Sequence, residues 1–138
     1  MDTFFNSVYY YLRSLYSQEL DNYLYSTIPG YLHLGIILLV STVIVCVVFY
    51  YMLAPVRNQA RWWFVYAGIN AIINIGSGLY YTVTPLINNQ INPDEEWSYL
   101  DCFGFCIANV IVSFVFFVAI SLLIKWGSIA KFVPFKKF

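Results

Sequence analysis

The chain has 138 residues, of which 61% are hydrophobic and 10% charged, and its formal net charge is zero. Soluble domains carry about 25% charged residues, so a soluble protein with buried helices would need more polar surface than this chain has. The neutral balance gives no reason to expect a nucleic-acid partner, and the length is enough for one domain.

Three long apolar runs dominate the chain, at residues 31–54, 62–87 and 98–124, with Asp101 as the only charge inside them. About 20 apolar residues in a helix cross the roughly 30 Å of bilayer hydrocarbon. The sequence therefore predicts an all-α integral membrane protein with three transmembrane helices, and a transmembrane domain over residues 29–125.

Residues 1–28, before the first run, predict an amphipathic interfacial helix. Apolar side chains recur there every three or four residues, which makes one apolar stripe on a helix. The stripe consists of Phe5, Val8, Tyr9, Leu12, Leu15, Tyr16, Leu20 and Tyr23. Tyrosines favour the wet edge of a bilayer, so the helix is expected to lie along the membrane or against neighbours. The alternative is a plain N-terminal extension.

The first run should form a helix that begins near Pro29, a residue well suited to a first helical turn. Its small polar positions are few (Ser41, Thr42 and Cys46), so we expect this helix to face lipid. Residues 54–60 then form a short connection, which forces the first two spans into an antiparallel hairpin.

The third helix is expected to start ahead of its apolar run. Asn92 can cap a helix, Pro93 suits the first position, and Glu95 stands three residues after the cap. We therefore predict a helix from about Pro93 to about Lys125. The basic and aromatic tail, residues 126–138, is expected to lie on the membrane surface.

Lys and Arg residues predict the orientation, because they concentrate on the cytoplasmic side of membrane proteins. Six of the seven belong to the first connection and the tail: Arg57, Arg61, Lys125, Lys131, Lys136 and Lys137. The remaining one, Arg13, lies in the N-terminal segment. We therefore expect the N-terminus outside and the C-terminus inside, in a bacterial inner membrane or an organellar inner membrane.

A row of polar side chains follows one face of the second run. It consists of Tyr66, Asn70, Asn74, Ser77, Tyr81, Thr84 and Asn88. At about 100° per residue, the seven positions fall within an arc of roughly 80°. Buried amides need partners, so this face should not meet lipid. Either several copies gather and the row lines a water-filled path, or the row hydrogen-bonds to neighbouring helices and holds the bundle together.

Small residues mark places where helices are expected to approach closely. On the second run these are Gly68, Gly76 and Gly78, and on the third they are Gly104 and Ala108. The third run also carries polar side chains on one face, which should pack on the second span or on another subunit. These are Cys102, Cys106, Asn109 and Ser113.

Residue types that carry catalysis or bind cofactors are sparse. His33, Asp101, Cys102 and Cys106 should lie near one membrane boundary, but their spacing is not that of a zinc site. No carboxylate lies deep in a span, and there is no Ser/His/Asp set or glycine-rich phosphate loop. We therefore expect no enzymatic activity, no cofactor and no metal.

Two function hypotheses follow from the polar row. The first is a homo-oligomeric pore or channel-like assembly, with the polar face of the second span lining the path. The alternative is a non-catalytic structural or assembly subunit of a larger membrane protein complex. In both, the expected partners are the lipid bilayer and other copies of the chain or other membrane subunits.

Overall fold

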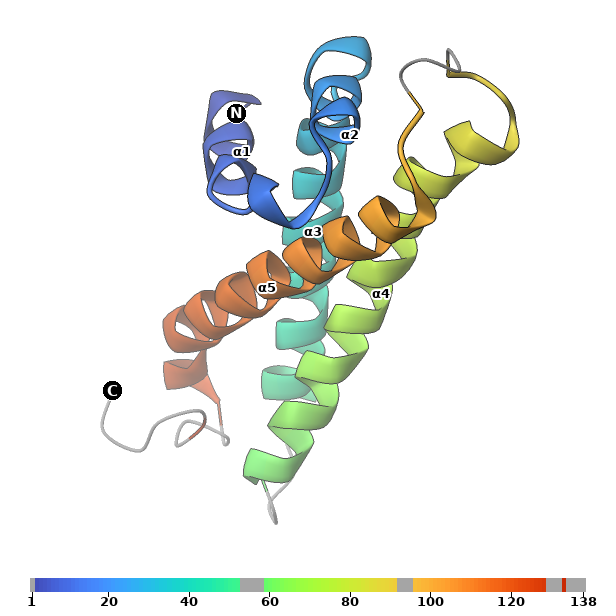
Figure 1. Cartoon of the computed structure of the whole chain (residues 1–138). Coiled ribbons are helices and arrows are strands. Elements are labelled where there is room, and N and C mark those ends of the chain that lie inside the picture. Colours follow the sequence, from blue (N-terminus) through green and yellow to red (C-terminus); the bar gives the residue numbers. More distant parts are fainter. Residues whose placement is uncertain (1, 53–58, 92–95, 129–132, 134–138) are drawn as a thin grey trace.

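The computed structural model describes residues 2–52, 59–91, 96–128 and 133, and the regular structure in these ranges is entirely helical (Figure 1). The all-α prediction is therefore confirmed for this part of the chain. The elements are α1 (Asp2–Tyr10), η1 (Arg13–Leu15), α2 (Gln18–Asn22), η2 (Tyr23–Thr27), α3 (Gly30–Val47), η3 (Val48–Met52), α4 (Gln59–Ile87), α5 (Tyr99–Ile124) and η5 (Lys125–Gly127).

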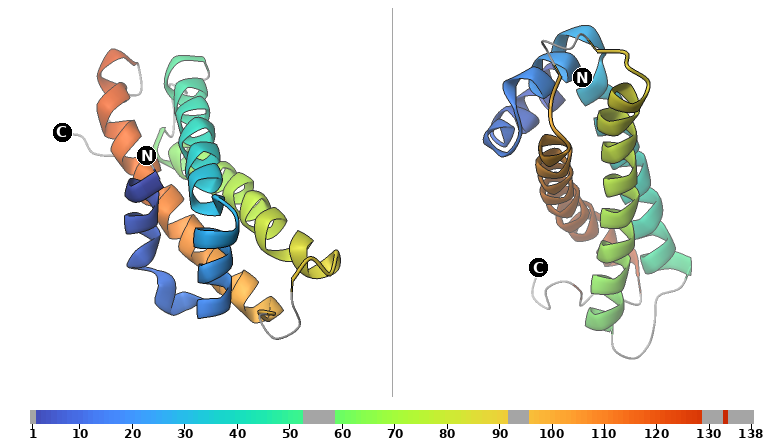
Figure 2. Two further views of the ribbon diagram at one scale, coloured as in Figure 1. Left: turned by 90° about the horizontal axis from the view of Figure 1, so that it is seen from above. Right: turned by 45° about the vertical axis from the view of Figure 1, so that its right-hand side comes forward.

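Three long helices form the body of the molecule. The chain runs in opposite directions along α3 and α4, and α5 crosses both obliquely (Figure 1). The short elements of residues 2–28, which we call the N-terminal layer, cover the end of the body where α3 begins and α4 finishes (Figure 2). The short first connection thus produces the predicted antiparallel pair of helices.

Two segments are long and apolar enough to cross a membrane, Gly30–Met52 and Tyr99–Gly127, and their most apolar 18-residue stretches have mean hydropathy 2.8 and 2.7. Helix α4 has comparable length but is less apolar, because asparagine, tyrosine and serine side chains interrupt its isoleucines. Hydropathy alone therefore picks out two of the three predicted spans.

The single helix predicted for residues 1–28 is wrong, since the N-terminal layer is broken into short helices. Tyr16 has extended backbone angles, and Ser17 starts a new helix by accepting a hydrogen bond from the Leu20 amide. The break lets the chain turn, so that Phe5, Tyr9 and Leu20 all reach the apolar core over the end of the body. Tertiary packing outweighs the continuous helical pattern here.

The start of the third helix also differs from the prediction. Residues 96–98 are not helical, and α5 begins at Tyr99. Ser98 caps it by accepting from the Asp101 amide, and the Asp101 carboxylate accepts in return from the Ser98 amide at 2.9 Å. This reciprocal capping satisfies free amides at the helix start. The predicted cap at Asn92–Glu95 lies outside the described residues.

At the opposite end of the body, the last turn of α5 is fixed to η3. The Tyr51 hydroxyl donates to the Ile124 carbonyl at 2.9 Å, and the Tyr50 hydroxyl donates to the Val133 carbonyl at 2.9 Å. Lys125 is fully buried, and its ammonium lies 5.2 Å from the centre of the Trp126 ring. The rest of the predicted surface tail and most of the first connection lie outside the described residues.

Candidate functional site

The centre of the body holds a group of polar side chains, all buried except the half-buried Ser41, which we call the polar core. It consists of Ser41 and Thr42 from α3, Asn70 and Asn74 from α4, and Asn109 and Ser113 from α5. The polar core lies between two apolar clusters, one beneath the N-terminal layer and the other around Phe49 and Phe117.

Asn70 joins all three long helices. Its amide donates to the Thr42 hydroxyl at 3.0 Å on α3 and to the Ser113 hydroxyl at 2.9 Å on α5. The side-chain oxygen of Asn70 accepts from the Ser41 hydroxyl at 3.3 Å. The side chain is 1% exposed, so these contacts replace solvent for its polar atoms.

Asn74, one turn further along α4, extends the network. Its amide lies 3.3 Å from the Ser41 hydroxyl and 3.2 Å from the Ser113 hydroxyl. The Asn109 amide donates to the Asn74 backbone carbonyl at 2.7 Å. Among the described residues, the Asn74 side-chain oxygen is the buried side-chain polar atom without a hydrogen-bond partner. The polar core is otherwise paired within one chain.

The network continues into the N-terminal layer. The Tyr9 hydroxyl donates to the Asn109 side-chain oxygen at 2.5 Å, and the Tyr9 ring stacks on Phe105. Nearby, the Tyr16 and Tyr31 hydroxyls lie 2.9 Å apart, and the Tyr31 hydroxyl donates to the Asp21 carboxylate. Tyrosines of the layer thus bond both to the polar core and to Tyr31 at the start of α3.

Burial raises the pKa of the Tyr16 hydroxyl to about 12. Burial also raises the pKa of Tyr9, with the neighbouring Tyr16 adding to the effect. Both shifts favour the neutral phenols, so the N-terminal layer holds these rings as uncharged hydrogen-bonding groups.

The other members of the predicted polar row lie outside the polar core that contains Asn70 and Asn74. Tyr66 and Tyr81 are half-buried and pack near the rings of Phe49 and His33 respectively. Ser77 donates to the Asn74 carbonyl at 3.0 Å. Thr84 is half-buried and Asn88 is exposed. The row therefore runs from the bundle interior to the surface.

The small residues predicted to mark close helix contacts are also partly buried in the bundle and partly exposed on its surface. Gly78 and Ala108 are buried, and a Cβ on Gly78 would lie 3.3 Å from the Cys106 sulfur. Gly68 and Gly76 are exposed, and an added Cβ would meet nothing within 4 Å in the described structure. The prediction that these two glycines permit close helix packing is therefore not met within this chain.

Gly104 packs against the N-terminal layer instead of another long helix. A Cβ built there would lie 1.9 Å from the Leu15 carbonyl oxygen. This backbone contact seats η1 on α5. The sequence shows a small residue at position 104, but the segment that it meets is 89 residues away and has no local signal.

The expectation that the first helix faces lipid does not hold for two of its polar positions. Thr42 is fully buried against α4, and Cys46 is buried with its sulfur 3.6 Å from the Ser121 hydroxyl. Ser41 and Thr42 are the partners that α3 supplies to the Asn70 side chain, and sequence reasoning missed this pairing. Their spacing of about 30 residues from Asn70 across a short connection is the signal that could have paired them.

The residues considered as metal ligands do not gather in one site. Cys102 and Cys106 are directed at the carbonyls of Thr82 and Ile75, at 3.6 and 3.9 Å. His33 is exposed beside Tyr81. Within residues 2–52, 59–91, 96–128 and 133, no three His, Cys, Asp or Glu side chains gather as a metal site would require.

No known protein-family model, curated protein or solved structure matches this chain. Its own geometry is therefore the basis for any functional argument. That geometry combines a neutral polar core, a tyrosine-rich layer over one end, and long apolar helices around both.

Proposed function

We propose that the chain is a three-span integral membrane protein that acts as a non-catalytic structural subunit of a membrane protein complex. The observation that carries this proposal is the placement of its polar and apolar side chains. Asn70 and Asn74 bond to α3 and α5 of the same chain, whereas large apolar side chains point outward from all three helices.

The outward apolar surface supports a bilayer as the surrounding medium. Its members include Ile36, Val40 and Ile44 on α3, Ile69, Ile72 and Leu79 on α4, and Phe103, Ile111 and Val115 on α5. Only 39% and 33% of the residues in the two most apolar stretches are buried. A core helix of a soluble protein is mostly buried, and exposed patches of this extent mark contact with lipid or protein.

Helix α4 serves as the third span in this proposal. Its polar side chains lower its hydropathy, but those at the centre are turned inward, and Ile72 on the other face is 70% exposed. An intramembrane amide is tolerated when it finds partners within the protein. The proposed location is a bacterial inner or organellar inner membrane, with the N-terminal layer outside.

The homo-oligomeric pore stays a prediction. It would need the polar row to face a path between copies. The Asn70 side chain and the Asn74 amide are hydrogen-bonded inside the single chain, so the geometry supports a role in hydrogen bonding between helices more than as a pore lining. This favours the structural subunit.

Labelling with a membrane-impermeant maleimide tests the three spans. In a background with the three native cysteines changed to serine, Ser26→Cys and Trp126→Cys place a thiol at exposed sites before α3 and after α5. With three spans, sealed cells or vesicles label at one site, and the other labels only after permeabilisation. Labelling of both from the same side would contradict three spans, because two spans return the chain to its starting side.

Purification in mild detergent followed by native mass spectrometry tests the subunit role. We expect the 16.0 kDa chain to co-purify with other membrane chains in fixed stoichiometry. A pure homo-oligomer that conducts ions after reconstitution would overturn the subunit proposal and favour the pore. A chain that remains a monomer in every mild detergent, with no co-purified protein, would also contradict it.

A further inference from the structure

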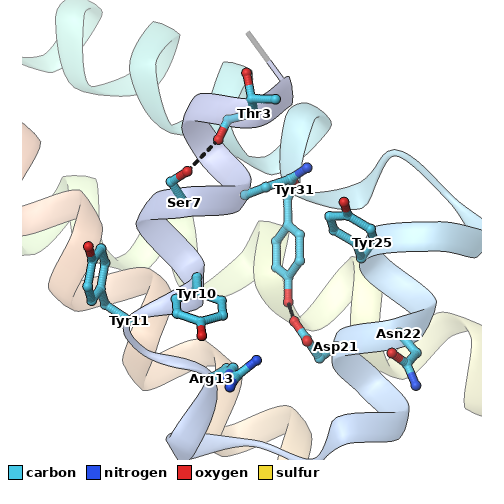
Figure 3. A pocket seen from close by; sticks show the side chains of 10 residues that line it. Thr3, Ser7, Tyr10, Tyr11, Arg13, Asp21, Asn22, Tyr25 and Tyr31 are labelled. Carbon is cyan, nitrogen blue, oxygen red and sulfur yellow. Dashed lines mark hydrogen bonds between the residues drawn. The ribbon is translucent and has the colours of Figure 1, made fainter.

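The N-terminal layer and the start of α3 border an open hollow of about 510 Å³, which the polar core does not line. Its walls include the aromatic and charged side chains of Tyr10, Tyr11, Arg13, Asp21, Tyr25 and Tyr31. Figure 3 shows Tyr11 and Tyr25 at the two ends, with Tyr31 and Asp21 between them. We call this site the tyrosine hollow.

Asp21 is held in a defined position at the hollow. The Tyr31 hydroxyl donates to its carboxylate, and Tyr31 is 2% exposed, so this hydroxyl is fixed by the packing around it. The Tyr16 hydroxyl supports Tyr31 from the interior at 2.9 Å. The carboxylate is thus oriented from behind and stays half-exposed toward the hollow.

Arg13 brings the opposite charge to the same hollow. Its guanidinium carbon lies 4.2 Å from the centre of the Tyr10 ring, which holds the cation by a cation–π contact. Guanidinium groups suit phosphate oxygens because they donate several parallel hydrogen bonds. A purely anionic ligand would be repelled by the Asp21 carboxylate, and a purely cationic ligand would be repelled by Arg13.

We propose that the tyrosine hollow binds a zwitterion made of a phosphate and an alkylammonium group, of the phosphocholine type. The phosphate pairs with Arg13, and the ammonium pairs with Asp21 while its methyl groups contact tyrosine faces. Tyrosine rings attract quaternary ammonium groups through their π electrons. Tyr25, which is more than half exposed, presents such a face, whereas the Tyr10 ring already contacts the Arg13 guanidinium.

The depth of the hollow agrees with this ligand class. Tyr31 is the second residue of α3, the helix that begins the apolar body. If α3 spans a bilayer, the hollow lies at the level of lipid headgroups, where tyrosines are enriched. The ligand can therefore be a lipid headgroup or a free phosphodiester such as glycerophosphocholine. The lipid source rests on the proposed function, whereas the chemistry of the hollow does not.

Titration of the full chain in a maltoside detergent, which carries no phosphate or ammonium, tests the proposal. Glycerophosphocholine is the free probe, and dihexanoylphosphatidylcholine is the lipid probe. Calorimetry should show saturable binding of at least one of them. Tighter binding of the lipid probe assigns the source to the membrane, and equal binding assigns it to the shared headgroup; both outcomes support the site.

Substitutions locate the binding in the tyrosine hollow. Asp21→Asn keeps an acceptor for Tyr31 but removes the charge, and binding should weaken about tenfold, as should Arg13→Gln. Tyr25→Leu should weaken binding about fivefold, whereas Tyr25→Phe keeps the ring and the affinity. Glu19→Gln is the matched control, because Glu19 lies on the same helix as Asp21 but does not line the hollow.

Two results would overturn the proposal. One is the absence of saturable binding of either probe to a wild-type chain whose far-UV spectrum is helical. The other is equal affinity in the wild type and in both charge variants. Failure of the proposed membrane topology is seen separately by maleimide labelling, so the two proposals can fail independently.

Discussion

Asn70 is the residue whose side chain connects the three long helices. Replacement by leucine keeps a similar volume but leaves the Thr42 and Ser113 hydroxyls without their partner amide. Hydrogen bonds between membrane helices contribute about 0.6 kcal/mol on average and up to about 1.7 kcal/mol. Asn70→Leu should therefore lower the free energy of unfolding by about 1–3 kcal/mol, measured by SDS titration in mixed micelles.

The same substitution at Asn88 is the control for Asn70→Leu. Asn88 belongs to the same polar row but is exposed beyond the end of α4. Its replacement should change the free energy of unfolding by no more than about 0.5 kcal/mol. An Asn70→Leu protein as stable as the Asn88→Leu protein would show that the polar core does not hold the helices together.

At the scale of the elements, the contact of η1 with α5 depends on the missing side chain at Gly104. In Gly104→Ala, the new methyl group would lie 1.9 Å from the Leu15 carbonyl oxygen, so the backbone of the N-terminal layer must move. Such overpacking lowers the free energy of unfolding by about 1–3 kcal/mol. We expect a lower thermal midpoint and faster tryptic cleavage at exposed Arg13.

Gly76→Ala is the matched control within α4. Nothing lies within 4 Å of the added methyl group, and alanine favours a helix over glycine by about 1 kcal/mol. This variant should be as stable as the wild type or slightly more stable, with unchanged cleavage at Arg13. Equal destabilisation by both substitutions would contradict the packing of η1 on Gly104.

The three long helices were predictable from the sequence because their signals are local and long. Apolar runs fix where α3, α4 and α5 lie to within a few residues, and the spacing of Asn70 and Asn74 shows that they share a face. That an amide needs partners in an apolar setting follows from physics alone. The helix that supplies these partners is decided by the way α5 crosses α3 and α4. No local feature of the sequence indicates this crossing.

The break in the N-terminal layer and the start of α5 were not predictable, because both depend on contacts between distant parts of the chain. The apolar spacing of the N-terminal layer continues through its break, so periodicity cannot reveal that Ser17 begins a new helix. Likewise, the sequence offers two capping patterns, Asn92–Glu95 and Ser98–Asp101, and α5 starts at the second, directly after its cap Ser98. Local sequence cannot choose between similar caps when long-range packing decides the position of the helix.

At the scale of the molecule, the described parts of the three long helices hold neutral polar side chains between two buried apolar clusters and expose many apolar side chains outside, which agrees with the proposed membrane location. At one end of the molecule, the tyrosines of the N-terminal layer make the folding stability depend on pH. Tyr16 has a pKa raised to about 12, against an ordinary value of 10.0, because burial disfavours the phenolate. Folding therefore keeps Tyr16 protonated at pH values where the unfolded chain would lose the proton.

The raised pKa of Tyr16 contributes stability in full below pH 10, and this contribution is lost as the pH rises from 10 through 12. The thermal midpoint in detergent, followed by far-UV ellipticity, should be level between pH 8 and 10 and fall from there to pH 12. Tyr16→Phe removes the ionising group and should weaken this fall, whereas Tyr11→Phe, at a position 83% exposed, should leave it unchanged. A fall of equal size in the wild type and in Tyr16→Phe would show that alkaline unfolding begins elsewhere.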